Sequence, residues 1–209
     1  AARRHLGAIF NRTSPSSGVP CTSTAVNEAA QYGKFQVLKW LKENGAEYCD
    51  TALRCAAEGG SLACLKYVCE QRMAPMDASE LEIAVRRALR NHHFDCVKYL
   101  VTEMGAPISE TVVYSACDAG QVKAVDFFVA QGHQITNSHY LTNATRCCRR
   151  TMVACLRRHG VAWDKGLTGR LLKENHYASL RLALEYGAPV IWHTKFAACK
   201  HNLREGAKM

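Results

Sequence analysis

Hydrophobic residues recur along this chain at helical spacing, in short segments that each close at a turn residue. The segments "FQVLKWLKENGAEYCD", "LACLKYVCEQRMAPMD" and "LRLALEYGAPV" show the pattern of an amphipathic stretch followed by a glycine or its replacement. The closing positions are Gly45, Arg72, Gly105, Gly132, Gly160 and Gly187, at intervals of 27, 33, 27, 28 and 27 residues. Such a period is typical of a solenoid built from supersecondary repeats. We therefore expect a stack of about six helix pairs.

The second helix of each unit carries apolar residues in matching columns. One column contains Leu38, Leu65, Val97, Val125, Val153 and Leu180, and a column three residues earlier contains Phe35, Leu62, Phe94, Val122 and Tyr177. Residues three apart share one helix face. We therefore expect both columns to be buried. The fifth unit departs from the pattern, because Arg150 takes the place of the earlier apolar residue.

The first helix of each unit carries small residues, which predict close helix packing. These residues are Ala29, Ala30, Ala56, Ala57, Ala88, Ala116 and Ala144. Three of the first helices are followed by Gly33, Gly60 and Gly120, where a left-handed residue ends a helix. In the other units His92, Cys148 and Asn175 stand at this position.

The segment "TALRCAAEGGSLACLKYV" resembles the ankyrin repeat, in which a Thr-small-Leu start and paired alanines precede a glycine turn and an aliphatic helix. The matching residues are Thr51, Leu53, Ala56, Ala57, Gly59 and Leu65. The endings "ENGAEYCD", "GAPIS", "GVAWD" and "GAPVI" are similar to those of abbreviated ankyrin-like arrays. The resemblance covers about residues 23–202. It implies an all-α, ankyrin-like helical-repeat solenoid of about six helix pairs that binds proteins.

The same resemblance sets the expected domain organisation. Residues 1–22 would be a basic N-terminal tail, residues 23–202 the repeat domain, and residues 203–209 a C-terminal tail. The alanine pair Ala197 and Ala198 predicts a C-terminal capping helix. A full ankyrin unit has about 33 residues and a β-hairpin finger. Units of 27 residues lack the length for this finger, so the usual fingertip surface is not expected.

Composition adds to this picture mainly by what it excludes. The chain has 209 residues, 48% of them hydrophobic, and contains no apolar run long enough to cross a membrane. Its eleven cysteines include no CxxC pair, and Cys55, Cys64, Cys117 and Cys155 fall within predicted helices. We read them as packed, reduced thiols. For Cys147 and Cys148, which flank arginines, a reactive thiol is the alternative.

No arrangement of residues predicts catalysis or ligand chemistry. The nine histidines include no HExxH motif, and we identified no other spacing suited to metal binding. The chain also lacks a phosphate-binding glycine loop after a strand and a GxSxG elbow. We therefore expect a protein that is not an enzyme and has no cofactor or metal site.

Positive charge is concentrated late in the chain. The net charge is +9, and the segment "TRCCRRTMVACLRRHG" carries much of it. We predict a partner-binding basic patch made of Arg146, Arg149, Arg150, Arg157 and Arg158. Guanidinium groups bind phosphate and carboxylate oxygens, so the patch suits rRNA, anionic lipid headgroups or an acidic protein face. A solvated face without a partner is the alternative.

A second predicted surface is an aromatic ladder on the second helices. Trp40, Tyr67, Tyr99 and Phe127 occupy one position in four consecutive units. Each lies two residues from the apolar column, which points it partly sideways. The ladder is therefore either part of the core or an anchor for another subunit.

The N-terminal segment bears on localisation. Its first 27 residues contain three arginines, seven Ser or Thr residues and no acidic residue. This composition is typical of an organellar import sequence. We expect a mitochondrial protein in the matrix or on the matrix face of the inner membrane, with a plastid or cytoplasmic location as alternatives.

Together these patterns predict a non-catalytic interaction scaffold. The first hypothesis is an accessory subunit of a large mitochondrial assembly, either a respiratory-chain complex or the ribosome. One alternative is a soluble ankyrin-type regulatory adaptor in the cytosol or nucleus. Another is an RNA-binding factor that uses the arginine-rich fifth repeat.

Overall fold

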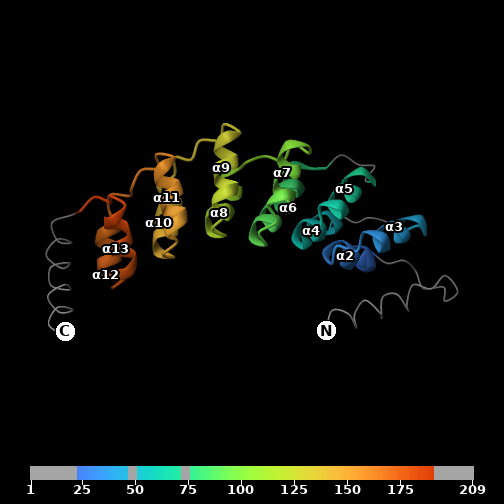
Figure 1. The fold of residues 1–209 in the computed structure, drawn as a ribbon, viewed down its shortest axis with the longest axis horizontal. Coiled ribbons are helices and arrows are strands. Elements are labelled where there is room, and N and C mark those ends of the chain that lie inside the picture. Colours follow the sequence, from blue (N-terminus) through green and yellow to red (C-terminus); the bar gives the residue numbers. More distant parts are fainter. Residues whose placement is uncertain (1–22, 47–50, 72–75, 191–209) are drawn as a thin grey trace. The chain divides into compact units, whose positions relative to one another are not determined.

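The computed structural model describes residues 23–46, 51–71 and 76–190, and in these ranges it is all-α, with twelve helices and no strand. The helices form six pairs (Figure 1). The first helices are α2 (Ser23–Gln31), α4 (Thr51–Gly59), α6 (Ala78–Arg90), α8 (Glu110–Asp118), α10 (Ser138–Arg146) and α12 (Leu167–Lys173). The second helices are α3 (Phe35–Glu43), α5 (Leu62–Gln71), α7 (Phe94–Thr102), α9 (Val122–Ala130), α11 (Arg150–Arg158) and α13 (Tyr177–Glu185).

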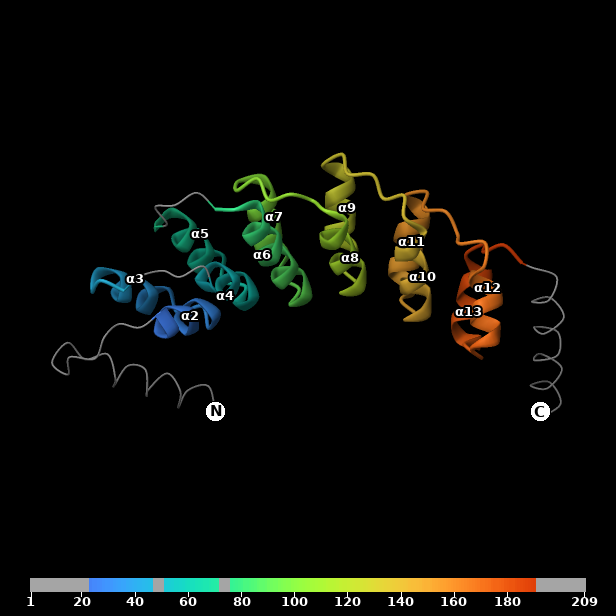
Figure 2. The same ribbon diagram turned by 180° about the vertical axis from the view of Figure 1, so that it is seen from behind.

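The helix pairs confirm the predicted helical-repeat solenoid of about six units. Figure 2 shows the same pairs from behind. The tails predicted at residues 1–22 and 203–209, and the capping helix predicted at Ala197 and Ala198, lie outside the described residues. No helix in the described ranges is long and apolar enough to span a membrane.

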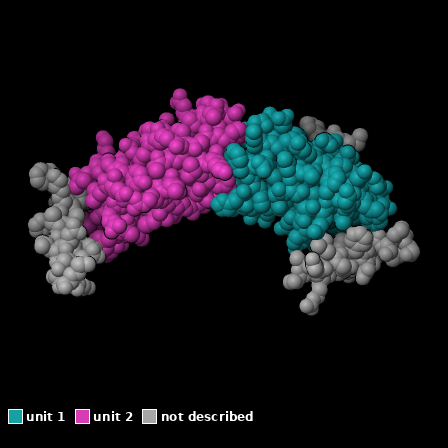
Figure 3. Space-filling model, viewed as in Figure 1, with its two compact units in different colours: residues 1–112 teal, residues 113–209 magenta. Residues whose placement is uncertain are grey.

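The chain divides into two compact units, residues 1–112 and residues 113–209, which Figure 3 colours separately. In the first unit α2 packs on α4 and α4 on α6, while α3 packs on α5 and α5 on α7. First helices thus stack on first helices, and second helices on second helices. In the second unit α9 packs on α11, and α10 contacts both α11 and α13.

The buried seam of the second helices was only half predicted. The column from Leu38 to Leu180 is buried, at 4% exposure or less, as expected. The earlier column is not: Phe35, for example, is half-buried and Tyr177 is 39% exposed. Each residue of that column is the first of its helix, where neighbouring turns cover it poorly. The seam instead continues one turn later, through Leu41, Val68, Leu100, Phe128, Leu156 and Ala183.

The turn inside each pair follows the prediction at all six positions. Gly33, Gly60 and Gly120 have positive φ, and so do the three residues that replace glycine: His92 (+62°), Cys148 (+52°) and Asn175 (+58°). In the fifth unit the Arg149 amide donates to the Ala144 carbonyl at 2.9 Å, which closes the end of α10. The chain therefore accepts left-handed strain at non-glycine residues to keep the same helix-ending geometry.

The second helices end in the same way. Gly45, Gly105, Gly132, Gly160 and Gly187 all have φ between +68° and +88°. The connections at 131–137 and 159–166 that follow two of these helices contain no strand, which agrees with repeats too short for a hairpin finger. Arg72, the predicted equivalent in the second unit of the array, lies outside the described residues.

Glycine has a different role at Gly59, near the end of α4. A Cβ atom placed there would lie 1.9 Å from the backbone carbonyl oxygen of Gln31, at the end of α2. Atoms cannot approach that closely, so the missing side chain sets the distance between these two helices. The alanines at 29, 30, 56 and 57 are buried in the same contact.

Candidate functional site

The five arginines of the predicted basic patch lie near the two ends of α11. Arg146 ends α10, and Arg149 and Arg150 begin α11. Arg157 and Arg158 lie in the last turn of α11. Because a helix rises about 1.5 Å per residue, the two groups are separated by about 12 Å along the axis. The arginines therefore form two groups instead of one patch.

The group at the start of α11 is engaged in ion pairs with other helices of the second unit. The pairs are Arg146–Glu174 at 3.4 Å, Arg149–Asp118 at 3.6 Å and Arg150–Glu185. Arg149 also donates to the Cys117 carbonyl at 2.9 Å, which ties α11 to the end of α8. Arg150, which interrupts the apolar column, thus contacts the next repeat through its charge.

The group at the end of α11 is also engaged. Arg157 donates to the Val161 carbonyl at 2.6 Å, and its guanidinium lies 5.7 Å from the centre of the Trp163 ring. Arg158 donates to Asp126 of α9 at 2.6 Å. All five arginines therefore bind groups of their own chain, and the acidic partners reduce the local positive potential below what the sequence indicates.

These ion pairs leave much of each guanidinium in contact with solvent. The side chains of Arg146, Arg150 and Arg158 are 53%, 52% and 63% exposed. A guanidinium has five N–H donors, so one carboxylate does not saturate it. An external carboxylate or phosphate would nevertheless share each arginine with an existing acidic partner.

The side chains of the predicted aromatic ladder are half-buried. In the first unit Trp40, Tyr67 and Tyr99 lie in α3, α5 and α7. The Phe35 ring packs edge-on against Tyr67 at 5.5 Å, and the Lys66 ammonium lies 5.4 Å from the Tyr99 ring centre. Burial is the main cause that raises the pKa of Tyr99, so its hydroxyl stays neutral.

The fourth member of the ladder belongs to the second unit. Phe127 lies in α9, half-buried, with its ring 5.9 Å from that of Phe128. In α11, the second helix of the following pair, Cys155 occupies the same position. The continuous part of the aromatic ladder therefore consists of Trp40, Tyr67 and Tyr99, which lie on neighbouring second helices of the first unit.

A groove of about 340 Å³ lies beside this surface, between α5 and α7. Its lining residues are Leu62, Lys66, Glu70, Asp95, Lys98, Tyr99, Thr102 and Glu103. Positive and negative side chains alternate along it, and Tyr99 supplies an apolar wall. Protein interfaces commonly combine an aromatic centre with a polar rim, so this groove is a candidate docking surface.

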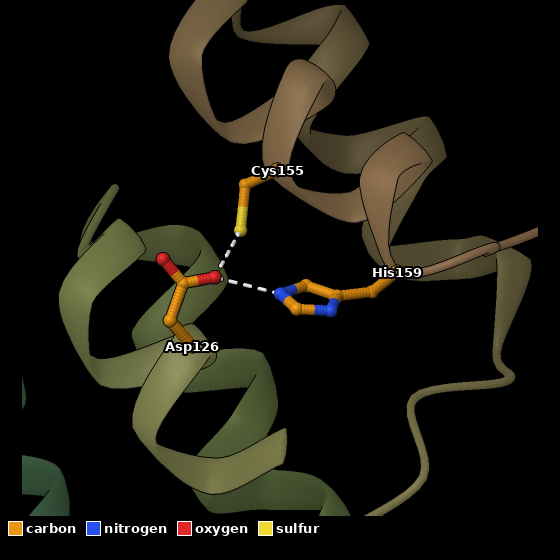
Figure 4. A group of neighbouring side chains, drawn as sticks. All are labelled: Asp126, Cys155 and His159. Carbon is orange, nitrogen blue, oxygen red and sulfur yellow. Dashed lines mark hydrogen bonds and ion pairs between the residues drawn. The ribbon is translucent and has the colours of Figure 1, made fainter. Parts of the chain in front are cut away.

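One cluster in the second unit was missed by the sequence analysis. Asp126 of α9 faces Cys155 of α11 and His159, which caps the end of that helix (Figure 4). His159 Nε2 lies 2.6 Å from Asp126 Oδ1, and the Cys155 thiol donates to the same oxygen at 3.4 Å. Half of this cluster can be recognised in the sequence, because Cys155 and His159 are four residues apart and share a helix face. Asp126, 29 residues earlier, could be found only by knowing how the repeats stack.

Two effects compete at this cluster. Burial alone would raise the pKa of Asp126, but the hydrogen bonds from His159 and Arg158 outweigh it and lower that pKa. Burial, followed by the neighbouring Asp126, raises the pKa of the Cys155 thiol to about 11. The thiol is therefore protonated at neutral pH and acts as a hydrogen-bond donor.

The remaining cysteines mostly match the packing prediction. Cys64 and Cys117 are buried and Cys55 is half-buried, and no described cysteine forms a disulfide. Burial raises the pKa of Cys117 to about 12, which makes this thiol unreactive. Cys147 and Cys148 are exposed.

Comparison with known protein families gives one match. Residues 26–110 fit the family profile for ankyrin repeats, in three copies. The match covers the helix pairs from α2 to α7 and ends at the start of α8. No curated protein sequence matches the chain.

Proposed function

We propose that this chain, whose residues 26–110 fit the ankyrin-repeat profile, is a non-catalytic protein-interaction scaffold and an accessory subunit of a large mitochondrial assembly, either a respiratory-chain complex or the ribosome. In this role it would hold neighbouring subunits by shape and charge. The matched repeats in residues 26–110 carry the proposal, because ankyrin repeats are interaction modules.

The feature that favours a protein partner is the aromatic surface of Trp40, Tyr67 and Tyr99 with its adjoining groove. Half-buried aromatic rings lose little conformational entropy on binding and bury a large area, which is why they dominate interface energies. The alternating charges of Lys66, Glu70 and Lys98 suit a partner with both signs of charge. We therefore place the main docking surface on the second helices of the first unit.

The N-terminal sequence supports the mitochondrial part of the proposal. Residues 1–27 contain Arg3, Arg4 and Arg12 without an acidic residue, which is typical of an import sequence. Import would deliver the chain to the matrix or to the matrix face of the inner membrane.

The ion pairs of the arginines in and next to α11 weaken the case for rRNA or lipid headgroups as partners. Nucleic-acid affinity depends on cations that neutralise phosphates and release counterions. Arginines already paired with Asp118, Asp126, Glu174 and Glu185 neutralise an incoming phosphate less effectively.

The test is native co-fractionation. Organelles from the source organism are extracted in mild detergent, separated by size, and the chain is followed by mass spectrometry. Migration with a megadalton particle supports the proposal, and the companion proteins show whether the particle is ribosomal or respiratory. Migration at the size of the free ~23 kDa chain overturns it and favours a soluble adaptor.

A paired variant locates the docking surface. Tyr67→Ala with Tyr99→Ala is expected to release the chain from the particle, because truncated aromatic anchors typically cost about 2 kcal/mol or more each. Tyr32→Ala is the matched control, since Tyr32 is 49% exposed in the same unit but lies outside the ladder. Equal release by both variants would place the interface elsewhere.

The RNA alternative has its own test. Replacing Arg149, Arg150, Arg157 and Arg158 together by glutamine should leave RNA binding unchanged if the partner is a protein. A salt-dependent RNA affinity that disappears in this variant would instead identify an RNA-binding surface.

A further inference from the structure

Three side chains with metal-binding atoms converge between two neighbouring repeats of the second unit. Asp126 points from α9 toward Cys155 and His159, which point back from α11 (Figure 4). A carboxylate oxygen, a thiol sulfur and an imidazole nitrogen all lie within 4.8 Å of one another. Among the described residues this is the one group of three or more such side chains at that separation.

We propose that Asp126, Cys155 and His159 bind one divalent metal ion of the zinc class, with water as the fourth ligand. Thiolate, imidazole and carboxylate together form the ligand set of a borderline-soft ion such as Zn²⁺, whereas Mg²⁺ and Ca²⁺ require oxygen ligands. Binding displaces the thiol proton, so the ion takes the place of the hydrogen bonds that now join the three side chains.

The distances suit a tetrahedral site after small side-chain movements. Zinc bonds of about 2.0–2.3 Å place neighbouring ligand atoms about 3.3–3.6 Å apart. The sulfur of Cys155 and Oδ1 of Asp126 already lie 3.4 Å apart. His159 Nε2 and Asp126 Oδ1, at 2.6 Å, must separate by about 0.7 Å to reach that geometry. The sulfur and the imidazole nitrogen must approach by no more than about 1.2 Å.

The local sequence holds two of the ligands in place. Cys155 lies in α11 and His159 is its C-cap residue, so the two are one helical turn apart on the same face. Paired ligands at this spacing are a common way for a helix to bind a metal. The third ligand comes from the packed neighbour α9, which fixes its distance.

The ion would also have a route to the site. Cys155 is 3% exposed, but the side chains of His159 and Asp126 are 20% and 39% exposed. A groove of about 600 Å³, lined in part by His133, Ile135, His159 and Gly160, opens beside the imidazole. An ion and its remaining water can therefore reach the ligands from solvent.

Arg158 opposes the metal. Its guanidinium lies 2.6 Å from Asp126 Oδ1 and 3.9 Å from the Cys155 sulfur. The side chain is 63% exposed, so it can swing into solvent when an ion enters. Arg158 and the metal thus compete for one carboxylate, and removing Arg158 should strengthen metal binding, because the repulsion between the guanidinium and the ion is lost.

The test is a cobalt titration of the reduced, full-length chain without oxygen. Co²⁺ replaces Zn²⁺ in such sites, and a thiolate ligand gives it a charge-transfer band together with intense tetrahedral d–d bands. We expect these bands to saturate at one ion per chain and to disappear when Zn²⁺ is added. No thiolate band at any Co²⁺ concentration would overturn the proposal.

Variants assign the bands to the cluster. Cys155→Ser should remove the charge-transfer band, while Asp126→Asn and His159→Gln should weaken binding at least ten-fold. Cys64→Ser, which changes a buried thiol of the first unit, should leave the titration unchanged. A band that survives Cys155→Ser, or that is lost in Cys147→Ser, would contradict the assignment.

A second measurement guards against misfolding. If the Cys155→Ser variant loses its helical circular dichroism signal, the His159→Gln variant is used for the test. His159 lies at a partly exposed helix end, so this change should not disturb folding. Zn²⁺ should raise the thermal midpoint of the wild-type chain, since a ligand that binds only the folded state stabilises it. It should raise the midpoint further in Arg158→Gln. Equal shifts in wild type and His159→Gln would refute the site.

Discussion

Replacing Gly59 by alanine tests how the first two helix pairs are spaced. The added Cβ would lie 1.9 Å from the Gln31 carbonyl oxygen, 2.6 Å from its carbon and 2.9 Å from its Cα. Contacts of this kind need at least 3.0 Å. Because the obstacle is backbone, no side-chain rotation relieves it, and α2 and α4 must move apart by about 1.1 Å or more.

Two opposing effects determine the free energy of this change. Alanine is favoured over glycine inside a helix by about 1 kcal/mol. Overpacking a close contact costs about 1–3 kcal/mol, and here the cost falls at the upper end because two backbones are involved. The net prediction is a loss of about 2 kcal/mol in the free energy of unfolding, from the difference between these two magnitudes.

Urea unfolding followed by helical circular dichroism measures this loss, and amide hydrogen exchange locates it. Protection should fall first in α2 and α4. Gly45→Ala is the control, because its Cβ would have nothing within 4 Å while its φ of +82° remains strained for alanine. That variant should lose only about 1 kcal/mol. A Gly59→Ala chain as stable as wild type would refute the view that this backbone contact sets the helix spacing.

Three further predictions concern other parts of the array. Leu65→Ala, in the buried column, should cost about 2–5 kcal/mol in urea unfolding, and Leu62→Ala, in the half-buried one, clearly less. Cys148→Gly should raise the free energy of unfolding by about 0.5–1 kcal/mol, because relief of left-handed strain exceeds the added unfolded-state entropy. Arg150 holds the pKa of Glu185 below its usual range, so this pair stabilises the fold above about pH 4 and is lost as pH falls through the lowered pKa; Glu185→Gln should flatten the acid limb of a stability–pH curve.

The turns could be predicted from sequence because they depend on local geometry. A residue between two helical segments at fixed spacing must adopt left-handed φ, whichever side chain it carries. Hence the positions of His92, Cys148 and Asn175 were as predictable as those of the glycines.

The second buried column could not be predicted in the same way. Spacing identifies residues that share a face, but i−3 and i+3 fit the period equally well. Phe35 and Leu41 both lie one turn from Leu38, and only the packed structure shows that Leu41 faces the neighbouring helix while Phe35 lies at a helix end. Helix boundaries, more than periodicity, decide this outcome.

Prediction of the candidate sites was limited because the sequence does not show which distant residues come into contact. Sequence identified Arg158 as a cation but not Asp126 as its acceptor, since the two are 32 residues apart. The same gap concealed the cluster of Asp126 with Cys155 and His159. Partners separated by about one repeat become visible only when the register between neighbouring repeats is known.

The ion pairs of α10 and α11 have a consequence for how the second unit comes apart. Four arginine–carboxylate pairs link different repeats there, formed by Arg146, Arg149, Arg150 and Arg158. Exposed charge pairs are screened by salt, whereas the apolar contacts inside each helix pair are not. Ionic strength therefore acts on the coupling between neighbours and leaves each hairpin intact. In concentrated salt the second unit should unfold less cooperatively, because its repeats are then coupled mainly by the packing of α9 on α11 and of α10 on α13.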